Sequence, residues 1–163
     1  MPKISSKTIL KKSFLEIKKN IQKLELIEED ILKASNMILK TINNNKVLFC
    51  GNGGSASDAA HVSAELLGRF LKERKALPSI CLSTNLSAIT AIANDYDYDQ
   101  VFSREFSSLA VEGDTLICLS TSGNSSNIVN LLNSFDSCQL NISANLLTSI
   151  RQTSSIPDST NIL

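Results

Sequence analysis

Residues 47–70 read VLFCGNGGSASDAAHVSAELLGRF and place a glycine loop beside two side chains that can do acid–base chemistry. Their apolar start is typical of a buried strand, GNGGS follows at 51–55, and a helix begins near Ser55. Backbone N–H groups and the helix dipole bind anions at such a junction. His61 and Glu65 follow four residues apart, on one face of the helix. This pattern indicates a phosphate site beside an imidazole and a carboxylate, which suits chemistry on a phosphorylated small molecule.

A second polar loop, STSGNS, follows another short apolar run and precedes a predicted helix. Its four hydroxyls are those of Ser120, Thr121, Ser122 and Ser125. Together with N–H groups at a helix start, hydroxyls can satisfy several phosphate oxygens without a lysine. The alternative is a helix cap, but one hydroxyl is enough for a cap, so four favour a ligand. GNGGS could also be a plain strand-to-helix turn. It has neither the GxGxxG spacing nor a GK[ST] ending, which counts against NAD and ATP.

The flanking residues support a site at the same edge. The apolar stripe of the first helix should face the sheet, which leaves His61 and Glu65 beside it and partly shielded. A solvated face with a weak i,i+4 pair is the alternative. Asn94 and Asp95 close the segment that follows the second apolar run, where a simple turn is the alternative.

Short apolar runs alternate with helical patterns from residue 46 onward. The predicted strands are 47–50, 80–83 and 115–120, with a weak one at 140–142; the predicted helices are 55–70, 99–109 and 125–135, with a further segment at 85–94. This alternation predicts an α/β fold with a doubly wound parallel sheet. Ligands bind such sheets at the carboxyl ends of the strands, where both polar loops fall.

Residues 7–44 read as two amphipathic helices ahead of this core. Such helices have no partner within the core, so we expect them to pack against copies of themselves. The predicted organisation is a single domain with N-terminal helices at 1–45, the core at 46–135 and an atypical tail at 136–163. Residues 1–46 carry ten lysines and five acidic residues, but no arginine and little aromatic interleaving. A solvated helix face is therefore favoured over nucleic-acid binding.

Composition narrows the class of protein. The chain has 163 residues, of which 42% are hydrophobic and 20% charged, as in ordinary globular domains. No apolar run is long enough for a bilayer, and no signal-peptide core is present, so we expect a cytoplasmic protein with no membrane partner. Cys50, Cys81 and Cys118 lie in apolar runs and read as buried thiols. No CxxC pair exists.

The motifs CGNGGSASDAAHVSAEL, GRF, AIANDY, FSRE and STSGNSSN resemble those of the sugar isomerase (SIS) domain family, and within it the phosphoheptose isomerases. The resemblance covers roughly residues 10 to 132. It implies a three-layer, flavodoxin-like α/β sandwich that forms a homotetramer. It also implies interconversion of sedoheptulose 7-phosphate and D-glycero-D-manno-heptose 7-phosphate, a step toward the heptose of lipopolysaccharide. The implied substrate-binding residues are Asn52, Gly53, Gly54, Ser55, Glu65, Asn94, Asp95, Ser120, Thr121, Ser122 and Ser125. His61 and Glu65 would bind zinc, and Glu65 would shuttle the proton.

One departure affects the expected activity. The family completes its site with a Gln and a second His from a C-terminal helix, whereas this chain has one histidine in total. We therefore expect impaired metal binding and impaired catalysis, from truncation, a frame shift or divergence of the tail. The alternatives are a non-catalytic SIS module that binds a phosphosugar or a protein such as a replication initiator, and a non-functional fragment.

Overall fold

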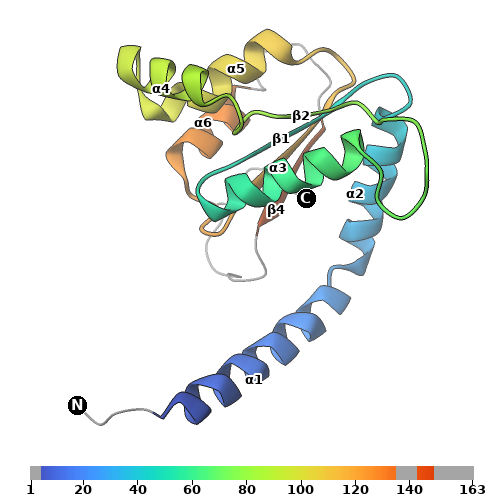
Figure 1. Ribbon diagram of the computed structural model, residues 1–163, viewed down its shortest axis with the longest axis vertical. Helices are drawn as coiled ribbons and strands as arrows, with labels where there is room; N and C mark the ends of the chain where they lie inside the picture. Colours follow the sequence, from blue (N-terminus) through green and yellow to red (C-terminus); the bar gives the residue numbers. More distant parts are fainter. Residues whose placement is uncertain (1–4, 135–142, 149–163) are drawn as a thin grey trace.

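The computed structural model describes residues 5–134 and 143–148, which form a parallel sheet covered by helices (Figure 1). The elements are α1 (Ser6–Glu25), α2 (Glu28–Thr41), β1 (Val47–Gly51), α3 (Gly54–Leu67), β2 (Ser79–Cys81), α4 (Leu86–Asp95), the 3-10 helix η1 (Tyr98–Gln100), α5 (Val101–Leu109), β3 (Thr115–Ser120), α6 (Ser126–Asn133) and β4 (Ser143–Thr148). The predicted α/β class is confirmed. Among the described residues, no helix has the length and apolarity needed to cross a membrane.

The sheet has four strands in the order β2–β1–β3–β4, and every neighbouring pair is parallel. Gly51 at the end of β1 pairs with Leu119 near the end of β3. The loops after these two strands therefore leave the sheet side by side, at its carboxyl edge. β4 lies within 136–163, and no strand was predicted at its position. The weak strand predicted at 140–142 lies outside the described residues.

Alternate side chains of a strand point to opposite faces of the sheet, and helices bury the side chains on both faces. One cluster holds Leu48, Cys50, Leu82, Phe102, Phe106, Leu116, Cys118, Ile128 and Leu131 under α4, α5 and α6. The other holds Val47, Phe49, Ala59, Cys81 and Ile117, with Ile38 and Ile42 packed against it from the α2 end. The layers are thus α4–α6, the sheet, and α2–α3 (Figure 1). Continuous apolar strands are the sequence signature of this arrangement.

Several element boundaries differ from the sequence-based expectations. α3 ends at Leu67, three residues before the predicted end, because Gly68 turns away with ψ −141° while its N–H donates to the carbonyl of Ala64 at 2.8 Å. The segment predicted at 85–94 is the helix α4, capped by Asn85, whose Oδ1 accepts from the N–H of Ala88 at 3.1 Å. The helix predicted at 99–109 is divided into η1 and α5.

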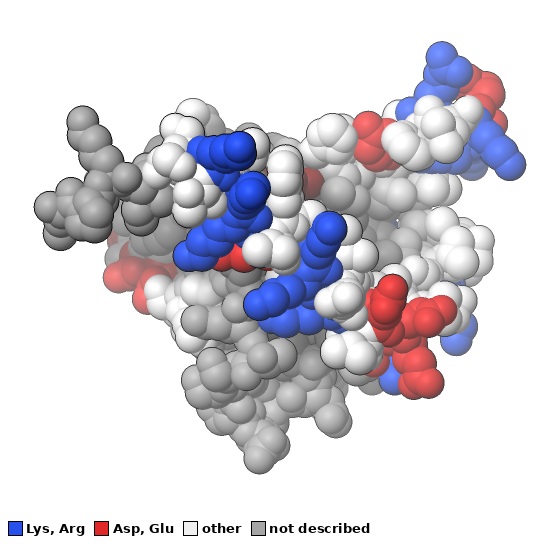
Figure 2. Space-filling model, turned by 90° about the horizontal axis from the view of Figure 1, so that it is seen from below, with Lys and Arg blue, Asp and Glu red and all other residues white. Residues whose placement is uncertain are grey.

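α1 extends away from the sandwich, and none of its residues is buried (Figure 1). A turn at Leu26 and Ile27 separates α1 from α2. Thr41, the last residue of α2, packs on the sheet. There the Thr41 hydroxyl lies 2.6 Å from the hydroxyl of Thr115 on β3. The lysines of α1 gather on the face seen from below (Figure 2). α1 therefore has an exposed apolar side and a basic side, as its amphipathic sequence predicted.

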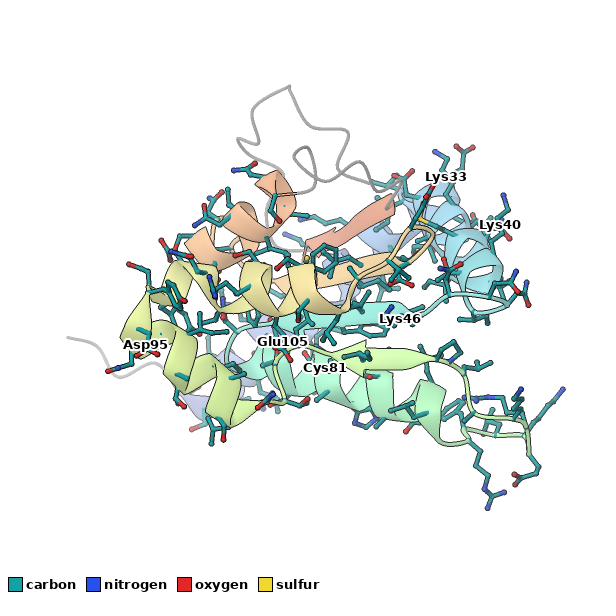
Figure 3. All side chains as sticks on the ribbon, turned by 90° about the horizontal axis from the view of Figure 1, so that it is seen from above. Lys33, Lys40, Lys46, Cys81, Asp95 and Glu105 are labelled. Atoms are coloured by element: carbon teal, nitrogen blue, oxygen red, sulfur yellow. The ribbon has the colours of Figure 1, made fainter. Side chains whose placement is uncertain are left out.

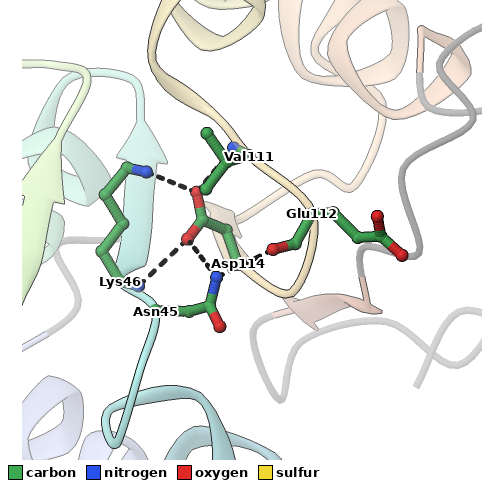
Figure 4. Close-up of polar contacts among 5 residues, drawn as sticks. All are labelled: Asn45, Lys46, Val111, Glu112 and Asp114. Atoms are coloured by element: carbon green, nitrogen blue, oxygen red, sulfur yellow. Dashed lines mark hydrogen bonds and ion pairs between the residues drawn. The ribbon is translucent and has the colours of Figure 1, made fainter.

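A buried carboxylate ties together the amino ends of β1 and β3 (Figure 4). Oδ2 of Asp114 accepts from Nζ of Lys46 at 2.6 Å and from the N–H of Val111 at 2.8 Å. Its Oδ1 accepts from the N–H of Lys46 at 3.0 Å. Asn45 donates to the carbonyl of Glu112 at 2.8 Å and so closes the turn. Burial alone would raise the pKa of Asp114, but the hydrogen bonds from Lys46 and Val111 lower it below its usual value.

Candidate active site

The loop after β1 needs glycine at two positions. A Cβ on Gly51 would lie 2.6 Å from the carbonyl oxygen of Ser55, so any side chain would force β1 and α3 apart. Gly53 has φ 55°, in the left-handed region that favours glycine, and it begins α3 without a side-chain cap. The Ser83 hydroxyl accepts from the N–H of Gly51 at 3.1 Å and donates to its carbonyl at 2.9 Å. The tips of β1 and β2 are therefore joined.

The loops after β1 and β3 are held together by side-chain amides. Nδ2 of Asn52 donates to Oδ1 of Asn127 at 2.8 Å, and Nδ2 of Asn127 donates back to Oδ1 of Asn52 at 2.9 Å. The Tyr98 hydroxyl also donates to Oδ1 of Asn52, at 3.0 Å. The predicted meeting of the two loops is present in the structure. Neither Asn127 nor Tyr98 was a predicted site residue. Asn127 is, however, the last residue of the STSGNSSN motif that carries part of the family resemblance.

The STSGNS loop presents its hydroxyls around the start of α6. The Ser120 hydroxyl accepts from the N–H of Gly123 at 3.1 Å and lies 3.4 Å from the Ser125 hydroxyl. The Ser122 hydroxyl accepts from the N–H of Asn124 at 3.2 Å, and Thr121 lies between these serines. Ser125 occupies the N-cap position of α6, yet its side chain makes no capping hydrogen bond. This argues against the capping interpretation and leaves the helix start able to receive an anion.

His61 and Glu65 lie on α3, with Nε2 of His61 3.5 Å from Oε1 of Glu65. The His61 side chain is 75% exposed and that of Glu65 40%, so His61 is less shielded than expected. Arg74 donates to the carbonyl of Glu65 at 2.6 Å and to that of Leu66 at 2.9 Å, which satisfies carbonyls in the last turn of the helix.

A zinc site needs more protein ligands than His61 and Glu65 supply. Structural and catalytic zinc sites use three or four protein ligands. Among the described residues, no three His, Cys, Asp or Glu side chains come together as a metal site. His61 and Glu65 are chemically suitable donors, but the described residues do not fit a zinc ion without further ligands.

Asn94 and Asp95 form the last turn of α4, where Nδ2 of Asn94 donates to Oδ1 of Asp95 at 2.9 Å. Figure 3 shows Asp95 and Lys46 at opposite ends of the molecule. Lys46 directly precedes β1, so Asp95 lies toward the carboxyl ends of the strands. The following 3-10 helix is fastened to α6, because the Ser126 hydroxyl donates to the carboxylate of Asp99. α4 and η1 thus border the strand-tip loops.

A buried carboxylate and a surface cavity both lie apart from the strand-tip loops. Oε2 of Glu105 is buried without a hydrogen-bond partner among the described residues, and burial raises the pKa of this carboxyl group. Figure 3 shows Glu105 close to Cys81, in the middle of the fold. A cavity of about 680 Å³ opens at the other edge of the sheet, lined in part by Asn45, Lys46 and Pro78. Since it lies at the amino ends of the strands, it is not the predicted ligand site.

Comparison with known proteins defines the class. The SIS domain model matches residues 12–148, and the chain belongs to the SIS domain family. A phosphoheptose isomerase from Aliarcobacter butzleri is 52% identical over 128 residues, which cover 77% of this chain and 68% of that protein. One from Helicobacter pylori is 50% identical over 123 residues, covering 74% of this chain and 64% of that protein. The matched part thus spans about two thirds of the length of these relatives.

Solved structures agree with this assignment. The phosphoheptose isomerase of Neisseria gonorrhoeae superposes with a TM-score of 0.79 at 34% identity, covering 88% of this chain and 75% of that one. The structure from Francisella tularensis gives a TM-score of 0.75 at 34% identity, covering 86% and 75%. The SIS fold and the resemblance to phosphoheptose isomerases are therefore confirmed.

Proposed function

We propose that this chain is a phosphoheptose isomerase, which interconverts sedoheptulose 7-phosphate and D-glycero-D-manno-heptose 7-phosphate on the route to lipopolysaccharide heptose. The observation that carries the proposal is the junction between the loop after β1 and the start of α6 through Asn52 and Asn127, at 2.8 and 2.9 Å. It lies just before the helix that bears His61 and Glu65. Relatives at about 50% identity bear that name.

The proposed substrate has seven carbons, with its phosphate on carbon 7 and isomerisation at carbons 1 and 2. The anion site and the base must therefore be different parts of the site, and the loop at 120–125 and Glu65 on α3 are separate elements. We assign the phosphate to the hydroxyls of Ser120, Thr121, Ser122 and Ser125. Asn52, Gly53, Gly54, Ser55, Asn94 and Asp95 complete the proposed substrate site.

Glu65 is the proposed base. Aldose–ketose isomerisation moves a proton between two adjacent carbons through an enediol, and one carboxylate can take and return that proton. Glu65 is 40% exposed on its side chain, so a substrate can reach it. The hydrogen bonds from Arg74 to the carbonyls of Glu65 and Leu66 hold its helical turn in place.

We propose zinc as a metal that His61 and Glu65 would help to hold, at a site that needs further ligands beyond this pair. A metal ion would polarise the sugar oxygens as a Lewis acid. Because the described residues do not complete such a site, the role proposed for Glu65 does not depend on the metal.

The proposal predicts that the chain binds sedoheptulose 7-phosphate saturably and binds sedoheptulose without the phosphate at least ten-fold more weakly. Charge-assisted hydrogen bonds to phosphate, each worth about 1.5–3 kcal/mol, are the physical reason. Calorimetric titration measures binding, and proton NMR measures turnover with and without added zinc. The absence of saturable binding would overturn the proposal, and so would binding without turnover at every zinc concentration.

A non-catalytic SIS module is the second candidate. The single histidine of the chain and the lack of a three-ligand cluster among the described residues favour it. Binding of the phosphosugar without turnover, at any zinc concentration, would decide for this alternative.

We also propose that the protein is a cytoplasmic homotetramer built through α1 and α2. Exposed apolar side chains on these helices include Ile9, Leu10, Phe14, Ile17, Ile21, Leu32 and Leu39. Exposed apolar patches of this kind mark association surfaces. The buried free thiols of Cys50, Cys81 and Cys118 support a reducing compartment.

The Phe14→Glu variant is expected to dissociate the tetramer, because a carboxylate would replace an apolar side chain at the interface. Analytical ultracentrifugation measures the mass in solution. The matched control is Gln22→Glu, which adds the same charge to an exposed position of α1 outside the apolar set. Dissociation by both variants alike, or by neither, would contradict a specific apolar interface.

A further inference from the structure

Asn52 is held by two side chains that come from other parts of the chain. Oδ1 of Asn52 accepts from Nδ2 of Asn127 at 2.9 Å and from the Tyr98 hydroxyl at 3.0 Å. Its Nδ2 donates to Oδ1 of Asn127 at 2.8 Å. Asn127 is 1% exposed, whereas Asn52 is half-buried, so Asn52 is the member of the pair that a ligand can reach.

The count of donors and acceptors determines what Asn52 can offer. An amide oxygen has two lone pairs and an amide nitrogen has two hydrogens. Both lone pairs of the Asn52 oxygen are used, by Asn127 and Tyr98, while one of its two N–H groups is used. A flip of the Asn52 amide alone would set its NH2 against the NH2 of Asn127, so the pair disfavours that flip. Among the described residues, one N–H of Asn52 therefore remains to donate.

The 3-10 helix that carries Tyr98 is itself anchored to α6. The neighbouring Asp99 accepts from the Ser126 hydroxyl, and its carbonyl accepts from Nδ2 of Asn130 at 3.4 Å. The 3-10 helix thus spans from α6 to the GNGGS loop. Contacts from both sides keep the Asn52 amide in place before any ligand arrives, which lowers the ordering cost of binding.

We propose that Tyr98 and Asn127 are positioning residues that hold Asn52 as a hydrogen-bond donor to an acceptor oxygen of the phosphosugar. The inference rests on the proposed function, because it names how that same site recognises its ligand. Asn52 then selects an oxygen that accepts, such as a phosphate or carbonyl oxygen, and disfavours a group that can only donate.

The test compares two Tyr→Phe variants of the full chain. Tyr98→Phe removes a hydrogen bond to Asn52, whereas the control Tyr96→Phe removes one from Arg104, whose Nη2 lies 3.1 Å from the Tyr96 hydroxyl. Calorimetry with sedoheptulose 7-phosphate is expected to show about five-fold weaker binding for Tyr98→Phe, the equivalent of one hydrogen bond, and no more than about two-fold for Tyr96→Phe. Equal affinities of the two variants would overturn the inference, whatever their melting temperatures.

A second measurement separates this inference from the proposed function. If the wild-type chain binds no sedoheptulose 7-phosphate, the proposed function fails, and the side-chain NH2 resonances of Asn52 in the free protein decide the positioning role. We expect those resonances to shift in Tyr98→Phe and in Asn127→Asp and to stay unchanged in Tyr96→Phe. Resonances that stay in place in all three variants would show that neither residue positions Asn52.

Discussion

The Glu65→Gln variant is expected to lose isomerisation, with kcat lowered about a thousand-fold and the affinity for sedoheptulose 7-phosphate changed no more than a few-fold. Glutamine keeps the size of the side chain and its place on α3 but cannot take up a proton. General bases contribute about 10²–10⁴-fold to such reactions. The affinity should be retained because the phosphate is assigned to the loop at 120–125, away from Glu65. Proton NMR of substrate and product measures kcat.

A partial reaction makes this test independent of the overall rate. In D2O, removal and return of the sugar proton replaces it with deuterium even where net conversion is slow. The wild-type chain should exchange this proton, Glu65→Gln should not, and the exposed control Glu112→Gln should match the wild type. Equal exchange by Glu65→Gln and the wild type would show that another group is the base.

The Asp114→Ala variant is expected to lower the free energy of unfolding by about 3 kcal/mol, the usual cost of breaking a buried ion pair. The side chain of Asp114 is 0% exposed and that of Lys46 is 21% exposed, so the lysine left behind is poorly solvated. The N–H groups of Lys46 and Val111 lose their acceptor as well. Urea unfolding followed by circular dichroism measures the change, and Glu112→Ala in the same turn is the control.

The stabilisation from Asp114 should depend on pH in a defined direction. The folded-state pKa of Asp114 lies below its usual value, so the unfolded chain takes up this proton first as the pH falls. The contribution is complete above the unfolded pKa of about 3.9 and is lost as the pH drops through the folded pKa. The stability difference between the wild type and Asp114→Asn should therefore shrink below about pH 4. A difference that stays constant down to pH 2 would contradict the assigned role.

Local patterns in the chain were sufficient for the sheet class and for the two loops. Apolar runs at 47–50 and 115–120 predicted strands that the structure places side by side in parallel. Because parallel strands end at the same edge of a sheet, the predicted parallel sheet also placed GNGGS and STSGNS at one edge, and in the structure Asn52 and Asn127 join this region. The sequence also identified the glycine loop that contains Gly51 and Gly53. The structure explains these two glycines by close packing at Gly51 and by a positive φ at Gly53.

The tertiary structure alone decided which side chains complete these features. Asn52 is 75 positions from Asn127 and 46 from Tyr98, and Asp114 is 68 positions from Lys46. No local periodicity encodes hydrogen bonds across such separations. β4 was missed for a similar reason: its sequence SANLLT has a weak strand pattern, and its conformation comes from pairing with β3. Short-range preferences thus specified the elements and loops, whereas packing of distant segments specified the polar contacts that orient Asn52 and bury Asp114.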